Sequence, residues 1–438
     1  MEEARAHTPH AIEHRTRRLD LASSLLAAGF LAVIEMGGAI AKKGFAATDF
    51  EVALLTSGQS LGLIASFFVA HRASHASKMP LVLWPELAAR LVLLPVAFLQ
   101  PRWALAFVGL HALAQMFQSI TIPARVTIYN LNYPPTRRGR IVGRIRQLQL
   151  IVTAGAALAL SLLLDWTAGE RKLVELLGDS PFPADAVVHA VPLLALVGIA
   201  GSVVFGRIPV HDDPVSRSAV VPIAETFRRF RRVWREDRDF RRYQNYFFLF
   251  GFANIMTIPL TQIHAVEALQ ADYFDLALIN VVLVQALMAV SMAFWGRKLD
   301  RHPPNFLRGV LNLIFSIDFL LLAFAPSIEW VYLGRLFRGI ALGGGTLIWM
   351  LGSLYYARSR EEAPIYLGIH TVLTGTRWLT APFVGVILKN FAGSARPVFL
   401  LSGLVIAATA VLMIRQSRRE PPRPLPTDPM PAPRSTGA

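Results

Sequence analysis

The amino-acid sequence predicts an all-α integral membrane protein with twelve transmembrane helices. The chain contains twelve apolar stretches, each close to the ~20 residues that a helix needs to cross the hydrocarbon core of a bilayer. Its basic residues concentrate in every second gap between those stretches. Because lipid offers the backbone no hydrogen-bonding partner, apolar runs of this length must be helical.

The twelve expected spans are distributed along almost the whole chain. They cover residues 21–41, 52–70, 80–99, 103–123, 147–165, 187–206, 244–268, 276–295, 309–326, 330–354, 365–388 and 397–414. The gaps after the second and eighth spans align at an offset of about 225 residues, and so do the starts of the fifth and eleventh spans. Equal span counts and this offset predict two pseudo-symmetric bundles of six helices.

The distribution of positive charge predicts the orientation of the chain. Of the 44 Lys and Arg residues, 33 lie in the two tails and the even-numbered gaps, and 7 lie in the odd-numbered gaps. Cytoplasmic loops carry the excess of basic residues. Both termini are therefore expected in the cytoplasm, in the inner membrane of a bacterial cell.

Two bundles and three polar segments make up the expected organisation. They are an N-tail (1–19), a first bundle (20–206), a cytoplasmic linker (207–242), a second bundle (243–415) and a disordered Pro-rich cytoplasmic tail (416–438). In the linker, apolar residues from Ile223 to Trp234 recur at spacings of three and four, which predicts an amphipathic helix in the membrane interface. Two interpretations of this helix stay open, a tether to lipid headgroups and a site for a partner. Residues 171–177 are expected to form a short surface helix.

Composition excludes several classes of protein. A net charge of +15 and a pI of 10.7 would suggest nucleic-acid binding in a soluble chain, but here the charge faces one leaflet. The absence of cysteine excludes disulfides and thiolate metal sites. Gly58-Gln-Ser60-Leu-Gly62 matches the letters of a hydrolase elbow, but it lies inside an expected span, where such glycines pack helices together. No cofactor, metal or enzymatic activity is expected.

Three short motifs carry a family resemblance. Gly296-Arg-Lys-Leu-Asp300-Arg301 resembles the cytoplasmic loop signature of the major facilitator superfamily, with a degenerate copy around His71 and Arg72. Arg335-Leu-Phe-Arg338-Gly339 and Ala381-Pro382-Phe-Val-Gly385 resemble two further motifs of that family, although they stand in the second half. The resemblance implies a secondary transporter that works by alternating access. It also implies that Gly296, Arg297, Asp300 and Arg301 form a loop that controls the conformational balance.

Polar residues in four of the spans give the best functional signal. Ionisable groups at membrane depth cost at least ~2.5–3.5 kcal/mol each on insertion scales, so each needs a reason. In the resembled fold, spans 1, 4, 7 and 10 line the central cavity. The expected proton carrier is Glu35. The expected solute-binding residues are His111, Gln115, Gln118, Asn254, Gln262, His264, Arg335 and Arg338.

Structural alternatives stay open for several of these residues. In the alternative for Glu35, its carboxylate pairs with an arginine and only fastens the two halves to each other. In the alternative for His111 and His264, both rings are buried packing residues with their hydrogen bonds made. Outside the four spans, Glu86 and Arg90 are expected to pair along one helix face. Asp318 and Arg377 both lie near the midplane, as partners of each other or of other groups.

The function expected from these observations is secondary active transport of a small organic solute, with protons as the coupling ion. A non-transporting membrane sensor or assembly scaffold is the alternative, and a lipid-modifying membrane enzyme is a third class. The expected partners are a small-molecule substrate, membrane lipids and coupling protons, without nucleic acid, and the expected state is a monomer. Two cavity arginines and one glutamate would suit an anionic or zwitterionic solute.

Overall fold

The computed structural model describes residues 9–73, 76–183, 185–210, 223–299, 301–357 and 362–419. Every regular element within these ranges is a helix. The first half contains α2 (Pro9–Leu26), α3 (Ala28–Ala39), η1 (Ile40–Gly44), α4 (Asp49–Ala73), α5 (Lys78–Leu91), η2 (Leu94–Phe98), α6 (Ala104–Ile120), α7 (Ile122–Asn132), α8 (Pro135–Thr167), α9 (Arg171–Leu177) and α10 (Val187–Gly206). The second half contains α11 (Ile223–Glu236), α12 (Arg238–Glu267), α13 (Tyr273–Ala277), η3 (Leu278–Val282), α14 (Leu283–Leu299), α15 (Pro304–Phe324), α16 (Ile328–Leu354), α17 (Ala363–Ala392) and α18 (Arg396–Arg419).

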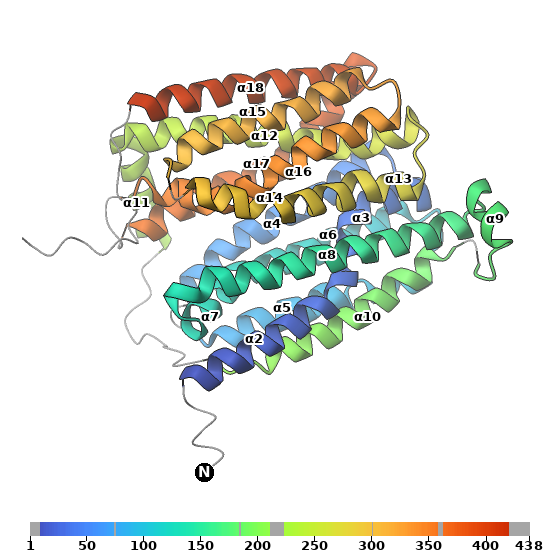
Figure 1. The fold of residues 1–438 in the computed structure, drawn as a ribbon, viewed down its shortest axis with the longest axis horizontal. Coiled ribbons are helices and arrows are strands. Elements are labelled where there is room, and N and C mark those ends of the chain that lie inside the picture. Colours follow the sequence, from blue (N-terminus) through green and yellow to red (C-terminus); the bar gives the residue numbers. More distant parts are fainter. Residues whose placement is uncertain are drawn as a thin grey trace, which may run out of the picture.

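The long helices run side by side, and the two halves of the chain occupy opposite sides of the molecule (Figure 1). Helices α2–α10 form one side, and α12–α18 form the other. The start of α2, the linker helix α11 and the end of α18 lie at the same end of the molecule, which we call the proximal end. Helices α9 and α13 lie at the opposite, distal end.

An all-helical membrane fold is confirmed. Within the described ranges, nine helices are long and apolar enough to cross a bilayer, and the pair α2 and α3, bent by 40°, adds a tenth. Helices α4 and α16, of 25 and 27 residues, stand at the second and tenth expected spans. Two arginines and the run Gly343–Gly345 lower the hydropathy of α16. The count of twelve spans stays a prediction for α4 and α16.

Small residues bring α4 close to its neighbours in both halves. A Cβ on Gly58 would lie 2.5 Å from the Cα of Ala112, and one on Gly62 would lie 2.2 Å from the backbone oxygen of Met116. Both contacts are with α6, so the Gly58–Gly62 pattern packs helices, as the sequence indicates. On the other side, a Cβ on Gly375 of α17 would lie 2.7 Å from Ile64. Gly375 therefore allows the two halves to approach closely at this point.

The helices expected outside the spans are present. Residues 171–177 form α9, and the amphipathic pattern of the linker forms α11. The apolar side chains of α11, among them Phe230, Val233 and Trp234, pack against an aromatic cluster around Phe240 in the second half. A helix expected against lipid headgroups is thus attached to its own bundle. The disordered tail was expected from residue 416, but α18 continues to Arg419. The rest of the expected tail lies outside the described residues.

Candidate functional site

A polar cavity of about 480 Å³ lies between the two halves. Most of its wall comes from α3, α4, α6, α7 and α8 of the first half, and α12 and α17 of the second half complete it. The polar lining residues are Glu35, Thr56, Gln59, Gln115, Gln118, Ser119, Thr121, Arg125, Tyr129, Arg146, Gln262 and Trp378. Amides, two guanidinium groups and one carboxylate give this cavity the donors and acceptors that a polar solute needs.

Four of the residues expected at the site from the sequence meet in this cavity, namely Glu35, Gln115, Gln118 and Gln262. Glu35 is exposed to the cavity. Within the described residues no ion pair or hydrogen bond holds its carboxylate, and Arg146 lines the same cavity. A carboxylate that fastens the two halves needs a fixed partner, so this geometry favours a carboxylate that is free to bind a proton or a solute.

His111 lies directly behind the cavity wall. Its ring is fully buried, with Nδ1 3.2 Å from the side-chain nitrogen of Gln115 and Nε2 3.4 Å from the backbone oxygen of Val33. A Cβ on Gly37 would lie 2.0 Å from this Nε2, so only glycine lets α3 approach the ring. If Gln115 donates to Nδ1, the proton of neutral His111 is on Nε2. His111 therefore orients Gln115 and does not line the cavity itself.

The arginines of the cavity are not the two expected from the sequence. Arg125 and Arg146 line it, although both lie in a gap whose charges we assigned to the cytoplasmic surface. Helix α7 carries the fourth span on to Asn132, and α8 begins at Pro135, well before the expected fifth span. Arg146 therefore stands about three turns inside α8. The sequence does mark where the helix of the fourth span ends, because Tyr133-Pro-Pro135 is the first helix break after that apolar stretch.

A buried charge network supports one wall of the cavity. Arg125 forms an ion pair with Glu86, and Arg90 lies 3.6 Å from the same carboxylate. Arg90 also donates to the side-chain oxygen of the cavity residue Gln118 at 3.1 Å. Glu86 and Arg90 thus pair along their helix as expected, and they also position Arg125 and Gln118 at the cavity.

Arg335 and Arg338 lie within the second half and do not line the cavity. Both pair with the buried carboxylate of Asp318, at 3.1 and 3.2 Å. Arg338 also donates to the side-chain oxygen of Asn254 at 3.1 Å and lies over the ring of Phe315. The glycines that follow do not leave space beside Arg338, because Gly343 and Gly344 pack against α14 and α15. The structure brings Arg335, Arg338 and Asn254 together around Asp318, away from Glu35.

We expect Asp318→Asn to be strongly destabilising. The substitution leaves the buried guanidinium group of Arg335 and the half-buried one of Arg338 without their shared anion. Breaking a buried pair from one side costs about 3–5 kcal/mol. Thermal unfolding of the purified protein measures this loss. Asp179→Asn, at an exposed position after α9, is the matched control and should leave the midpoint unchanged. An unchanged midpoint for Asp318→Asn would show that the cluster adds nothing to stability.

The remaining predicted site residues are elsewhere. His264 is buried against Phe399 in the second half, with a ring separation of 5.6 Å. Of the predicted conformational loop, Gly296 and Arg297 belong to the last turns of α14, and Arg301 donates its backbone N–H to Lys298. Asp300 lies outside the described residues.

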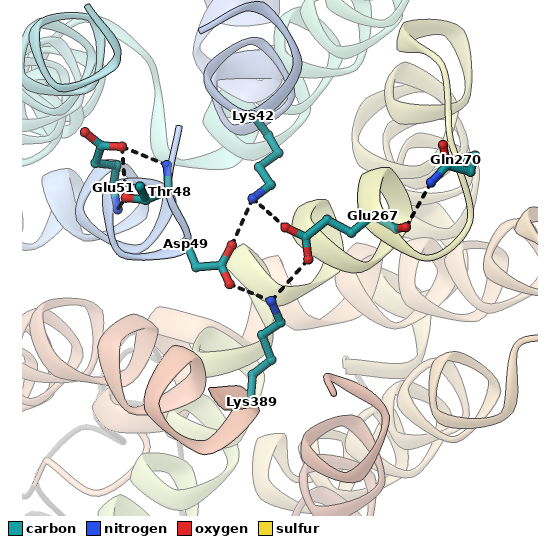
Figure 2. A network of polar contacts seen from close by, with 7 residues as sticks. All are labelled: Lys42, Thr48, Asp49, Glu51, Glu267, Gln270 and Lys389. Atoms are coloured by element: carbon teal, nitrogen blue, oxygen red, sulfur yellow. Dashed lines mark hydrogen bonds and ion pairs between the residues drawn. The ribbon is translucent and has the colours of Figure 1, made fainter. Parts of the chain in front are cut away.

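Four charged residues join the two halves at the distal end (Figure 2). Lys42 and Asp49 come from the first half, and Glu267 and Lys389 come from the second. Lys42 lies 2.9 Å from Asp49 and 2.7 Å from Glu267, and Lys389 lies 2.5 Å from Asp49 and 3.2 Å from Glu267. We call this alternating ring of two ammonium groups and two carboxylates the distal ion lattice. Sequence reasoning missed it, because each member ends or begins a different helix.

A second polar contact closes the distal end beside the lattice. The carboxylate of Asp165, at the end of α8, accepts the backbone N–H groups of Tyr273 and Phe274 at 2.8 and 2.7 Å. Those two residues begin α13, so a side chain of the first half caps a helix of the second. Lys43 adds a hydrogen bond to the backbone oxygen of Ala271 at 3.0 Å. In this conformation the two halves are tied together at the distal end.

The fold and the cavity between two helical halves agree with the comparisons with known proteins. The family model described as Major Facilitator Superfamily matches residues 21–363 and 245–437, and the chain belongs to this superfamily. A search of curated protein sequences found no match. Among solved structures, the crystal structure of a D-xylose-proton symporter aligns with a TM-score of 0.65 and 11% identity over 94% of this chain and 98% of that chain. The crystal structure of the nucleoside transporter NupG (D323A mutant) aligns with a TM-score of 0.67 and 11% identity, over 92% and 99%. At this identity the two structures show the shared fold alone.

Proposed function

We propose that this protein is a secondary active transporter that moves a small organic solute across the membrane by alternating access. The observation that carries the proposal is the polar cavity between the halves, closed at the distal end by the ion lattice and the Asp165 cap. A cavity at the interface of two bundles faces each side of the membrane in turn when the bundles rock.

The proposed orientation places the proximal end, with both termini and α11, in the cytoplasm of a bacterial cell. The excess of basic residues in the tails and even-numbered gaps supports this orientation. The structure then represents an inward-facing state, because the contacts that join the halves at the distal end would close the cavity to the outside. The two bundles, 20–206 and 243–415, are the proposed moving units, in a protein that works as a monomer.

We place the solute against Arg125 and Arg146, with Gln59, Gln115 and Gln262 as neutral partners. Arg335 and Arg338, which we expected to bind it, are held by Asp318 in this conformation. Guanidinium groups bind carboxylates and phosphates with planar, paired contacts, so an anionic or zwitterionic solute fits this cavity. Glu35 is the proposed proton carrier, because it shares the cavity with Arg146 and has no fixed partner among the described residues. The solute and the proton would then influence each other directly.

The experiment that tests the proposal has two stages. A thermal-shift screen of the purified protein against classes of metabolite identifies a solute that binds, since binding stabilises the folded state by mass action. Uptake of that solute into proteoliposomes is then measured with and without a proton gradient. Gradient-driven accumulation is the expected result. A protein that binds and moves no solute, but co-purifies with a fixed protein partner, would instead be the scaffold that we consider as the alternative.

The proposed topology gives a further prediction. A reporter that works only in the periplasm, fused after Ile208, should be silent, because the linker would lie in the cytoplasm. The same reporter fused after Gly178, in the loop that follows α9 at the distal end, is the matched control and should be active. The reverse pattern would invert the orientation and turn the present state into an outward-facing one.

A further inference from the structure

The second half contains two buried arginines that have no carboxylate. Arg308 of α15 is 6% exposed and Arg377 of α17 is 3% exposed. Neither has an ion pair within the described residues, and their charges act on each other. The sequence suggested Asp318 as a partner of Arg377, but the structure commits Asp318 to Arg335 and Arg338. Each buried cation costs several kcal/mol in desolvation unless it is compensated.

Four other arginines inside the bundles are paired with a carboxylate. Arg90 and Arg125 share Glu86, and Arg335 and Arg338 share Asp318. One carboxylate between two guanidinium groups is therefore an arrangement that this protein uses twice. Arg308 and Arg377 form a third such pair, whose central anion does not come from the described residues.

An aromatic ring holds the pair together. The guanidinium carbons of Arg308 and Arg377 lie 4.7 and 4.8 Å from the ring centroid of Phe247. The rings of His370 and Tyr243 lie 4.7 and 5.8 Å from the same phenyl ring. Two cations and two polar rings thus surround one side chain of α12. Cation–π contacts offset part of the cost of burying the charges, but they do not neutralise them.

Several hydrogen-bonding atoms of this cluster are unused. Arg377 donates to the backbone oxygen of Phe247 at 2.5 Å and to the hydroxyl of Thr374 at 2.8 Å, and Arg308 donates to the backbone oxygen of Gly345 at 3.3 Å. Four buried atoms have no partner within the described part of the chain: Nε of Arg308, Nε of Arg377, the hydroxyl of Tyr243 and Nε2 of His370. Buried polar atoms are rarely left unpaired, and each one asks for a cause.

We propose that Arg308, Arg377, Tyr243 and His370 form a binding site for a small oxyanion, distinct from the cavity around Glu35. An oxyanion supplies the missing negative charge and accepts hydrogen bonds from the guanidinium groups and the phenol. Nδ1 of His370 lies 3.2 Å from the side-chain oxygen of Gln244, which only accepts, so the proton of neutral His370 is on Nδ1. Its Nε2 therefore accepts a hydrogen bond from the hydroxyl of a protonated oxyanion such as hydrogen phosphate. Three glycines keep the donors in place, because a Cβ on Gly251 would lie 2.0 Å from Nη1 of Arg377 and one on Gly352 would lie 2.1 Å from the hydroxyl of Tyr243. The third is Gly345, whose backbone oxygen accepts from Arg308. A Cβ on Gly345 would lie 3.0 Å from Nη1 of Arg308. The anion is either free in the cytoplasm or the anionic group of a transported solute.

Inorganic phosphate is the probe for this site. Thermal unfolding of the purified full-length protein is followed while phosphate replaces chloride at constant ionic strength, and phosphate should raise the midpoint in a saturable way. Tyr243→Phe removes one donor without changing the shape of the site, and it should weaken phosphate at least about tenfold, as expected when a hydrogen bond to a charged group is lost. Arg377→Gln should abolish the effect. Arg229→Gln, in the exposed surface of α11, should retain it.

Two comparisons separate the outcomes. Arg146→Gln alters only the central cavity, so the phosphate effect should persist in this variant, and its loss would place the phosphate in that cavity and overturn the proposal. Binding of a solute identified in the thermal-shift screen, compared between Tyr243→Phe and the unaltered protein, separates the two sources of the anion, because it weakens only if the anion is part of that solute. If Arg377→Gln does not fold, Tyr243→Phe alone decides. A midpoint that does not respond to phosphate in the unaltered protein, or a response that Tyr243→Phe leaves unchanged, would overturn the proposal. Transport of a solute does not enter this test, so the proposed function stands or falls separately.

Discussion

Glu35→Gln is expected to abolish proton-driven accumulation of the solute while leaving solute exchange across the membrane largely intact. Glutamine has the shape of the protonated carboxyl group but cannot release a proton. Net uptake requires the empty carrier to return after giving up its proton, and the variant cannot complete that step. Exchange requires only that a loaded carrier reorients in both directions, so it does not depend on the release of a proton.

The structure favours this role for Glu35 through its surroundings. The carboxylate is exposed to the cavity, shares it with Arg146 and has no ion pair among the described residues. Glu51→Gln is the matched control, since Glu51 caps α4 by accepting from the backbone N–H of Thr48 at 2.7 Å, and glutamine preserves such a capping box. Both activities are measured in proteoliposomes. Full gradient-driven accumulation by Glu35→Gln would exclude the coupling role. His264, His111 and Asp318 would then be the next candidates for the proton carrier.

The helices of this fold could be predicted from the sequence because lipid leaves the backbone no other option. The ends of the helices could not. The apolar stretch of span 4 ends near residue 123, but the helical path continues through α7 to Asn132, because protein neighbours there replace lipid around polar side chains such as Arg125 and Tyr129. Hydropathy marks the part of a helix that lipid surrounds, so it misses the extension through α7 that carries Arg125 and the first turns of α8 that carry Arg146.

The candidate site shows the same limit. Glu35 and three glutamines were found because polar residues inside an apolar stretch need a reason, and the structure brings them together. Arg335 and Arg338 are also polar residues inside an apolar stretch, but both are explained by an ion pair with Asp318 on another helix. Which carboxylate meets which arginine depends on the packing of α15 against α16, and one sequence does not specify this packing.

The distal ion lattice has a geometry suited to opening. Each half contributes one ammonium group and one carboxylate, and these two also contact each other within the half. Separation of the halves breaks the contacts from Lys42 to Glu267 and from Asp49 to Lys389. It leaves Lys42 with Asp49 and Lys389 with Glu267, so no charge loses every partner. The lattice can therefore favour the closed distal end by a modest free energy without preventing the return.

Exchanging the two charges of the second half should open the distal end. In the double variant Glu267→Lys with Lys389→Glu, the pair within the second half is preserved, but both contacts between the halves become repulsive. Each contact between partly exposed charges is worth roughly 0.5–1 kcal/mol, and its replacement by a like-charge contact costs a similar amount again. The two contacts together should shift the closed and open populations at least about tenfold.

Because the chain contains no cysteine, a single introduced thiol reports this shift. Gln59→Cys places it in the cavity wall, and a membrane-impermeant maleimide added from the outside should label it at least about ten times faster in the double variant. Reversal of all four charges, with Lys42→Glu and Asp49→Lys added, restores every attraction and should return the labelling to its original rate. If the double variant is labelled no faster, the lattice does not hold the distal end closed. If the fourfold variant stays fast, lost packing rather than charge opens it.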